Sequence, residues 1–342
     1  MTPFDPDAAA LPGSGIFGLP EDKGGAAVHI IAVPFDATSS YGDGAADAPA
    51  AIFRASHQVE LHDPVTGNPW REGLAYLEDD GSIAGLNEEA RPLVKEIRTA
   101  GGTGKTPELH RSLARVNELC EQMNDEIYRR TNAAFNGDHS PIILGGDHSV
   151  AFGAVRAAAE RYPGLGILHF DAHADLRSSY EGFSNSHASI FHNLTTKLDS
   201  LGTILQVGLR DFGQGEHEAI KARPEKLRAV FDSDWSRARL EGRDLAAYVR
   251  DSLCFLPETV WVSFDIDGLD PSLCPGTGTP VPGGLSWAEA MLWLEELKAS
   301  GRRVVGCDLV EVAPSASLRG GDSWDAIVGA RLLYRLAGTL RP

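Results

Sequence analysis

The sequence predicts an α/β domain in which a parallel sheet is covered by helices on both faces. Segments with strand character alternate with helical segments through most of the 342 residues. The strand segments are almost uniformly apolar, which is typical of strands that are buried on both faces. Clusters of polar residues follow several of these strands at their C-terminal ends, where open parallel sheets bind their ligands.

The elements are expected in one domain that follows an N-terminal arm. Residues 1–25 are rich in Pro and Gly and predict an arm and not a core element, whereas residues 26–342 form the predicted catalytic domain. Short apolar runs predict strands at 28–35, 141–146, 164–175, 203–211, 260–267 and 302–311. Helical patterns lie within 50–63, 88–98, 107–135, 149–163 and 286–301.

Composition excludes several classes of function. A formal net charge of −17 argues against binding to nucleic acid through a basic surface and suits a cationic ligand. No apolar run approaches the length of a membrane span, and no basic segment followed by an apolar core begins the chain, so we expect a cytoplasmic protein. The four cysteines lack the spacing of a disulfide framework or a zinc ribbon; they are Cys120, Cys254, Cys274 and Cys307.

The polar clusters at the strand ends carry the chemistry. They read GGDHS (145–149), DAHAD (171–175), DID (265–267) and DLVE (308–311). Alternate residues of an extended segment point to one side, so the two aspartates and the histidine of DAHAD converge, and their carboxylates repel each other unless a cation lies between them. Imidazole and carboxylate ligands suit Mn, Ni, Co or Zn. The carboxylates outnumber the needs of one ion, which indicates two ions that share bridging carboxylates.

Each cluster alone has a structural interpretation as well. Asp147 next to His148 could cap a helix, Asp265 and Asp267 could form a turn, and His173 could be an ordinary buried histidine. Their alignment at neighbouring strand ends favours the metal centre over this set of independent explanations.

Five segments resemble the ureohydrolases, the arginase and agmatinase superfamily. They are GGDHSV (145–150), HFDAHADLR (169–177), SHAS (186–189), SFDIDGLDPSLCPGTGTPVPGGLS (263–286) and EVAP (311–314), in the order and spacing of the family. The resemblance covers about residues 28–340 and implies a three-layer α/β/α arrangement with a mainly parallel central sheet, the arginase-like fold. It also implies an enzyme that hydrolyses C–N bonds of linear amidines, with two divalent ions, Ni²⁺ or Mn²⁺, at the strand ends.

The family's functional residues are carried over by position. The resemblance implies that one ion is held by His148, Asp171, Asp175 and Asp265. It implies that the other is held by Asp171, His173, Asp265 and Asp267. His187 matches the histidine that shuttles protons, Glu311 matches the carboxylate that binds the guanidinium, and Asp175 is counted among the catalytic residues as well as the ligands. Asp308 could support the ligands or be structural.

Other segments of the sequence narrow the range of substrates that we expect. LPGSGIFGLP (11–20), the segment 34–63, SSYEGFSNSHASIFHNL (178–194) and GDSWDAIVGARLLYRL (321–336) resemble the branch of guanidine, alkylguanidine and metformin hydrolases, which look like nickel enzymes. We therefore expect hydrolysis of guanidine, an N-alkylguanidine or metformin to urea plus ammonia or an amine. The alternative is an agmatinase or guanidinobutyrase. Asp47-Ala48-Pro49 departs from the family pattern near the pocket mouth, which leaves the far end of the substrate open.

The sequence indicates the residues of the pocket wall less specifically than it indicates the metal ligands. Candidates are Thr38, Tyr41, Tyr180, Asn185 and Trp324. Trp324 could cover a small cation through a cation–π contact, or it could start the last helix and pack in the core.

Two other classes compete with this hypothesis. A deacetylase of the same fold would use one zinc ion and would lack His148 and Asp175, which are present here. A non-catalytic subunit would lack ligands, so the chain would be the catalytic subunit if it pairs with a paralogous chain in a hetero-oligomer. From the resemblance we otherwise expect a homo-hexamer or trimer.

Overall fold

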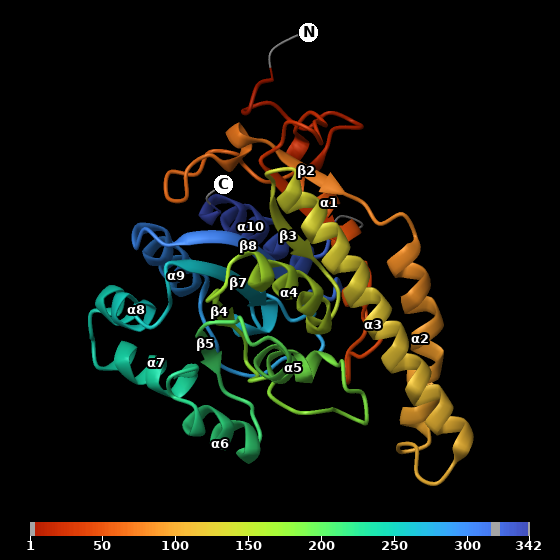
Figure 1. The fold of residues 1–342 in the computed structure, drawn as a ribbon. Helices are drawn as coiled ribbons and strands as arrows, with labels where there is room; N and C mark the ends of the chain where they lie inside the picture. Colours follow the sequence, from red (N-terminus) through yellow and green to blue (C-terminus); the bar gives the residue numbers. More distant parts are fainter. Residues whose placement is uncertain (1–3, 316–321, 341–342) are drawn as a thin grey trace.

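Eight parallel strands form one sheet in this computed structural model, which describes residues 4–315 and 322–340 (Figure 1). The strands are β1 Val28–Ala32, β2 Leu74–Leu77, β3 Ser140–Leu144, β4 Gly166–Phe170, β5 Ile204–Leu209, β6 Leu227–Phe231, β7 Thr259–Asp265 and β8 Arg303–Val310. Their order across the sheet is β2-β1-β3-β8-β7-β4-β5-β6. The predicted α/β class and the parallel sheet are confirmed.

Helices cover both faces of the sheet. They are α1 Ala48–Ser56, α2 Ser82–Thr99, α3 Pro107–Asn136, α4 Ala151–Arg161, α5 Ile190–Lys197, α6 Gln214–Ala222, α7 Asp232–Leu240, α8 Leu245–Leu253, α9 Trp287–Ala299 and α10 Trp324–Thr339. Alternate strand residues point to opposite faces: Ile30 and Ile142 pack in the core with α1 and α7–α10, whereas Ile31 and Ile143 pack in the core with α2–α6. The three-layer arrangement is therefore present.

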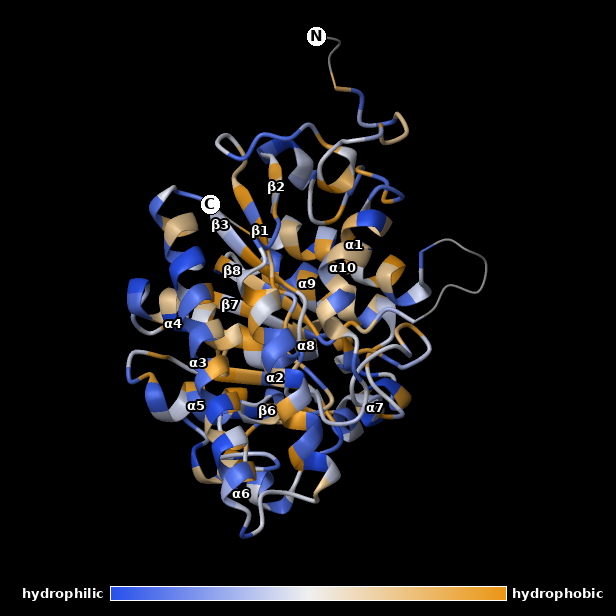
Figure 2. Ribbon diagram, turned by 90° about the vertical axis from the view of Figure 1, so that its right-hand side faces the viewer, coloured by the Kyte–Doolittle hydropathy of each residue, from blue (hydrophilic) through white to orange (hydrophobic). Residues whose placement is uncertain are grey.

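The apolar strands lie between these helix layers, and the hydrophilic residues collect on the outer helix surfaces (Figure 2). α3 and α4 approach each other closely, since a Cβ added at Gly153 would lie 2.1 Å from the backbone oxygen of Asn124. Among the described residues, no helix is both long and apolar enough to cross a membrane.

The two strands that the sequence did not predict are the edge strands β2 and β6. β2 has only four residues, and β6 carries the exposed Arg228 in a mixed burial pattern, so neither shows the uniformly apolar run of a central strand. The predicted strand 164–175 was too long, because β4 ends at Phe170 and the polar residues that follow form a loop. α2 is longer than expected, starting at Ser82 and not near 88.

Part of the predicted arm belongs to the core. Ile16 and Phe17 are buried, and the ring of Phe17 packs edge-on against Tyr334 of α10 at 4.9 Å between centroids. The expectation that residues 1–25 are only an arm is wrong for this part, because its few apolar residues are concentrated there. Residues 1–3 of the arm, 341–342 of the predicted domain and Gly321 of the segment 321–336 lie outside the described residues.

Candidate active site

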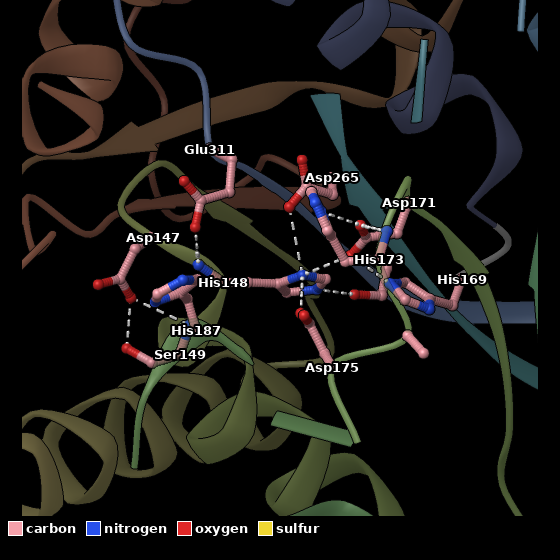
Figure 3. A network of polar contacts seen from close by, with 12 residues as sticks. Asp147, His148, Ser149, His169, Asp171, His173, Asp175, His187, Asp265 and Glu311 are labelled. Atoms are coloured by element: carbon pink, nitrogen blue, oxygen red, sulfur yellow. Dashed lines mark hydrogen bonds and ion pairs between the residues drawn. The ribbon is translucent and has the colours of Figure 1, made fainter. Parts of the chain in front are cut away.

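Four neighbouring strands bring the candidate residues to one edge of the sheet. β3, β8, β7 and β4 are adjacent and parallel, so their carboxyl ends share an edge. His148 follows β3, the segment 171–175 follows β4, Asp265 ends β7 and Glu311 follows β8. Figure 3 shows these side chains pointing toward one another.

The first group surrounds the ring of His148. Its Nδ1 lies 3.2 Å from a carboxylate oxygen of Asp171, 3.2 Å from one of Asp175 and 3.4 Å from one of Asp265. All four side chains are buried, and this Nδ1 has no hydrogen-bond partner. Three carboxylate oxygens around an imidazole nitrogen that forms no hydrogen bond is the arrangement expected when a cation binds between them.

Hydrogen bonds behind His148 fix which nitrogen faces the carboxylates. Ser263 Oγ donates to Asp308 (2.8 Å) and accepts from His148 Nε2 (2.9 Å). With the proton on Nε2, the lone pair of Nδ1 points into the cluster. Asp308 also accepts from Trp261 Nε1 at 2.6 Å, so it anchors the orientation of His148 from behind.

The second group surrounds His173. Its Nδ1 lies 3.0 Å from Asp267 Oδ2 and 3.4 Å from Asp171 Oδ1. Asp171 thus turns one oxygen to His148 and the other to His173, as expected of a bridging ligand. The structure brings all six predicted ligands together, and their role as metal ligands stays a prediction.

His169 also belongs to this site, and the sequence analysis missed it. Gln206 Nε2 donates to Ala174 O (2.9 Å) and to His169 Nδ1 (3.0 Å), so His169 carries its proton on Nε2 and donates to Asp171 Oδ2 (2.8 Å). Burial lowers the pKa of His169 to about 4, which keeps this ring neutral. The signal was available, because His169 continues the alternate spacing of 171, 173 and 175 in the sequence.

The buried carboxylates of the cluster need positive charge to balance them. The pKa of Asp175 is raised to about 7, mainly by burial and secondly by the negative charge of Asp171. Burial is the main cause that raises the pKa of Asp265 well above its usual value, and the negative charges of Asp267 and Asp171 raise it further. Burial works to lower the pKa of His173, but Asp267 and Asp171 raise it to about 12. In the metal-free chain, protons thus balance the buried carboxylates; divalent ions would supply that charge instead, and the donor set fits them.

The backbone is strained at two of these residues. Asp175 has φ 53° and Glu311 has φ 62°, in the left-handed region that residues other than glycine seldom adopt. Such strain persists where the surroundings determine the conformation, as at active sites. Glu311 N donates to Gly146 O (2.9 Å) and Glu311 Oε1 accepts from His148 N (2.8 Å), so both ends of the residue are fixed beside the cluster.

His187 lies on the other side of the cluster, against the segment 38–40. Its backbone N–H donates to Thr38 Oγ1 (3.1 Å), its Nε2 lies 3.3 Å from Ser40 Oγ, and its ring meets Tyr180 edge-on. The buried Nδ1 has no hydrogen-bond partner. Burial is the main cause that lowers the pKa of His187 to about 3, and the charge of Arg98 lowers it further, so the ring is neutral in the metal-free chain.

A cavity of about 330 Å³ opens above these groups. Of the residues that line it, Asp175 and His187 are buried and His173 is partly buried, whereas Tyr41 and Asp211 are exposed and therefore lie toward the solvent. The volume falls at the lower end of the roughly 300–1,000 Å³ that is typical of small-molecule sites.

The predicted pocket walls are not all at this cavity. Tyr41, which is 90% exposed, and Tyr180 line it. Thr38 is fully buried and its hydroxyl donates to Asp147; Asn185 is buried and accepts from Lys197; Trp324 is 53% exposed at the start of α10 and donates to Ser272 O. These three are not among the residues that line the cavity, and contact of any of the five with substrate stays a prediction.

Comparison with known proteins gives one consistent family. The model of the arginase family matches residues 26–338. The chain is similar to N(1)-aminopropylagmatine ureohydrolase of Thermus thermophilus, with 32% identity over 92% of this chain and 90% of the relative. It is 36% identical to guanidinobutyrase of Pseudomonas aeruginosa over 57% of this chain and 59% of the relative. The solved structure of agmatine ureohydrolase of Thermoplasma volcanium has a TM-score of 0.69 at 25% identity, covering 93% of this chain and 91% of that one.

Proposed function

We propose that this chain, which belongs to the arginase family and is a hydrolase of C–N bonds in linear amidines, acts on a guanidine with an amine-bearing alkyl tail, of the agmatine class. The products are urea and the amine that carried the guanidino group. This substrate class corresponds to the alternative in the sequence analysis, and it now ranks above guanidine and metformin.

The cavity beyond the cluster is the observation that carries this proposal. A free guanidinium ion would fill only a small part of its 330 Å³, whereas an alkylguanidine could extend from His173 and Asp175 toward Asp211. Glu311 is buried beside the cluster and is not among the residues that line the cavity. Asp211 is exposed, and within the described chain it forms no ion pair, so its carboxylate is available to a terminal ammonium group.

Among the described residues that line the cavity, the arginine is Arg177, and it is already engaged. Arg177 Nε lies 3.6 Å from Glu216 Oε2, and its guanidinium stacks over Tyr180 at 5.2 Å from the ring centre. An anionic tail such as that of 4-guanidinobutyrate would compete with Glu216 for this charge and would face Asp211. The charges therefore favour an ammonium tail over a carboxylate tail.

Two of the three relatives described above support an agmatine-type substrate. They are named aminopropylagmatine ureohydrolase and agmatine ureohydrolase, and the third is named guanidinobutyrase. The resemblance of the N-terminal and C-terminal segments to guanidine and metformin hydrolases has no counterpart among these names.

The side chains suit guanidine hydrolysis. Glu311 can accept paired hydrogen bonds from the planar guanidinium, whose positive charge offsets the burial that raises the pKa of this carboxyl. Two divalent ions, Mn²⁺ or Ni²⁺, would be held by the six predicted ligands and would supply a hydroxide nucleophile at neutral pH. His187 can take a proton released at the site and deliver it to the leaving amine as the C–N bond breaks. Water is consumed, and urea and an amine are formed.

Urea release across a panel of guanidines tests this proposal. The purified chain is stripped of metal, loaded separately with Mn²⁺ and with Ni²⁺, and assayed with N(1)-aminopropylagmatine, agmatine, 4-guanidinobutyrate, guanidine and metformin. We expect the highest kcat/KM with agmatine or its aminopropyl derivative. A higher kcat/KM with guanidine or metformin would return the chain to the small-guanidine hypothesis, and a preference for 4-guanidinobutyrate would contradict the assignment of the tail charge.

A further inference from the structure

Arg98 connects two segments that flank the cavity but does not itself line it. It lies in the last turn of α2, and its side chain is only 24% exposed. Its guanidinium donates to the backbone oxygens of Thr38 (3.0 Å) and Ser39. The same group forms an ion pair with Glu181 at 2.5 Å. All three of these partners are separated from Arg98 by about 60 or more residues in the chain.

The first segment, residues 38–40, contacts His187 directly. Thr38 Oγ1 accepts the backbone N–H of His187, and Ser40 Oγ lies 3.3 Å from its Nε2. The carbonyl groups that Arg98 binds immediately precede Ser40, so the guanidinium restrains the backbone that carries the Ser40 hydroxyl.

The second segment, residues 180–183, contacts His187 from another side. Tyr180 and Phe183 exchange backbone hydrogen bonds of 3.1 and 2.8 Å, which close a tight turn with Glu181 within it. Glu181 has φ 53°, a costly conformation that the ion pair with Arg98 helps to hold. The Tyr180 ring meets the His187 ring edge-on at 5.8 Å between centroids.

We propose that Arg98 is a positioning residue for the hydrolysis: it joins the segments 38–40 and 180–183 so that Ser40 and Tyr180 hold the imidazole of His187 at the cavity. This inference rests on the proposed proton transfer by His187. A guanidinium suits the task because its planar fork can donate to two carbonyl oxygens and a carboxylate at once. A lysine ammonium is a single point and cannot reproduce that geometry.

An ordinary surface ion pair would not position a side chain of the active site. Exposed pairs contribute little, because both partners are solvated and mobile. Arg115 of α3 provides the comparison: within the described residues its ion pairs go to Glu89 of α2 (2.7 Å) and Glu118 (2.8 Å), and neither partner belongs to a cavity segment. Arg98 differs in that it is less exposed and donates to backbone oxygens beside the active site.

The test compares Arg98→Ala and Arg98→Lys with the control Arg115→Ala. The wild-type chain and the three variants are loaded with metal, and metal content, thermal unfolding, kcat, KM for agmatine and the solvent deuterium isotope effect on kcat are measured. We expect Arg98→Ala to keep its metal and to lose kcat on the order of 10- to 100-fold, as displaced catalytic groups do, with a smaller change in KM. The isotope effect should increase because the displaced imidazole transfers its proton more slowly. Loss of the Arg98 charge, which lowers the pKa of His187, acts in the opposite direction, and we expect the displacement to have the larger effect. Arg98→Lys should recover only part of kcat, and Arg115→Ala should resemble the wild type.

The isotope effect separates positioning from mere loss of folded enzyme. If Arg98→Ala only lowered the active fraction, kcat would fall while the isotope effect stayed at the wild-type value, and that result would overturn the proposal. Should Arg98→Ala fail to fold, Glu181→Gln, which leaves the contacts to 38–40 intact, must still raise the isotope effect. A wild-type chain that releases no urea from any guanidine would instead refute the proposed function, so the two failures are distinguishable.

Discussion

The floor and the rim of the cavity are held in place by different means. We call the six predicted metal ligands the floor, although only His173 and Asp175 of them line the cavity itself. The six are His148, Asp171, His173, Asp175, Asp265 and Asp267. The rim consists of Ser40, Tyr41, Tyr180 and Asp211, which come from loops. Floor residues follow the ends of adjacent buried strands, so the sheet itself sets their distances. Rim residues depend on contacts between distant segments, such as those of Arg98. Under the proposed function, the chemistry would lie on the rigid floor and the selection of the substrate on the loops of the rim.

Removing a floor carboxylate should have the largest effect. Asp265→Ala deletes an oxygen that lies 3.4 Å from His148 Nδ1 and leaves the remaining charges unbalanced. We expect loss of bound metal and of urea release to below detection, measured by elemental analysis and by the urea assay. Asp138→Ala, an exposed aspartate just before β3 at the opposite end of the sheet, is the control. Near-normal turnover in Asp265→Ala would refute the floor as a metal centre.

Glu311→Ala should separate substrate binding from metal binding. Glu311 is not one of the ligands, but it is fixed beside them through His148 N and Gly146 O. We expect the metal content of the wild type together with a turnover that is nearly abolished, because the guanidinium loses its carboxylate partner. Loss of metal in this variant would instead show that Glu311 belongs to the floor.

The floor was predictable from the sequence and much of the rim was not. Polar residues that follow apolar strands are visible in the sequence, and the carboxyl ends of parallel strands lie at one edge of the sheet, so the place of the floor could be predicted. The expected strand alternation does not explain it, because Asp171, His173 and Asp175 lie in the loop after β4. Thr38 and Arg98 meet only after α2 has packed on the sheet, about 60 residues away in the chain, and no local pattern reports that contact. Trp324 was an ambiguous candidate for the same reason, since its spacing could not tell a cavity from the helix start where it lies.

Metal affinity should depend on pH, whereas contacts at the rim should not. Asp175, whose pKa is about 7 in the metal-free chain, must release its proton before it can bind an ion. Below pH 7 that proton competes with the metal, and so does the proton of His173, whose pKa is about 12. We therefore expect affinity to rise more than about tenfold per pH unit below pH 7 and to keep rising by at least about tenfold per unit above it. Calorimetric titration with Mn²⁺ between pH 5.5 and 8 measures it. An affinity that stays constant over this range would contradict the crowding of carboxylates at the floor.

Changing a rim charge should have the smallest effect. Asp211→Asn removes the exposed carboxylate near the entrance while keeping its shape. We expect KM for agmatine to rise a few-fold, as for a solvent-exposed ion pair, with kcat and metal content unchanged. The KM for guanidine, which has no tail, is the internal control and should stay the same. An equal rise for both substrates would show that Asp211 does not select the tail.

The central claim is that the floor holds two divalent ions that are needed for hydrolysis. Its most direct test is urea release from agmatine by the metal-free chain during stepwise addition of Mn²⁺, and in parallel of Ni²⁺, with bound metal measured at each step. The account predicts negligible activity without metal and a plateau at two ions per chain with at least one of the two metals. Full activity at one ion per chain, or activity that persists after the metal has been removed, would contradict it.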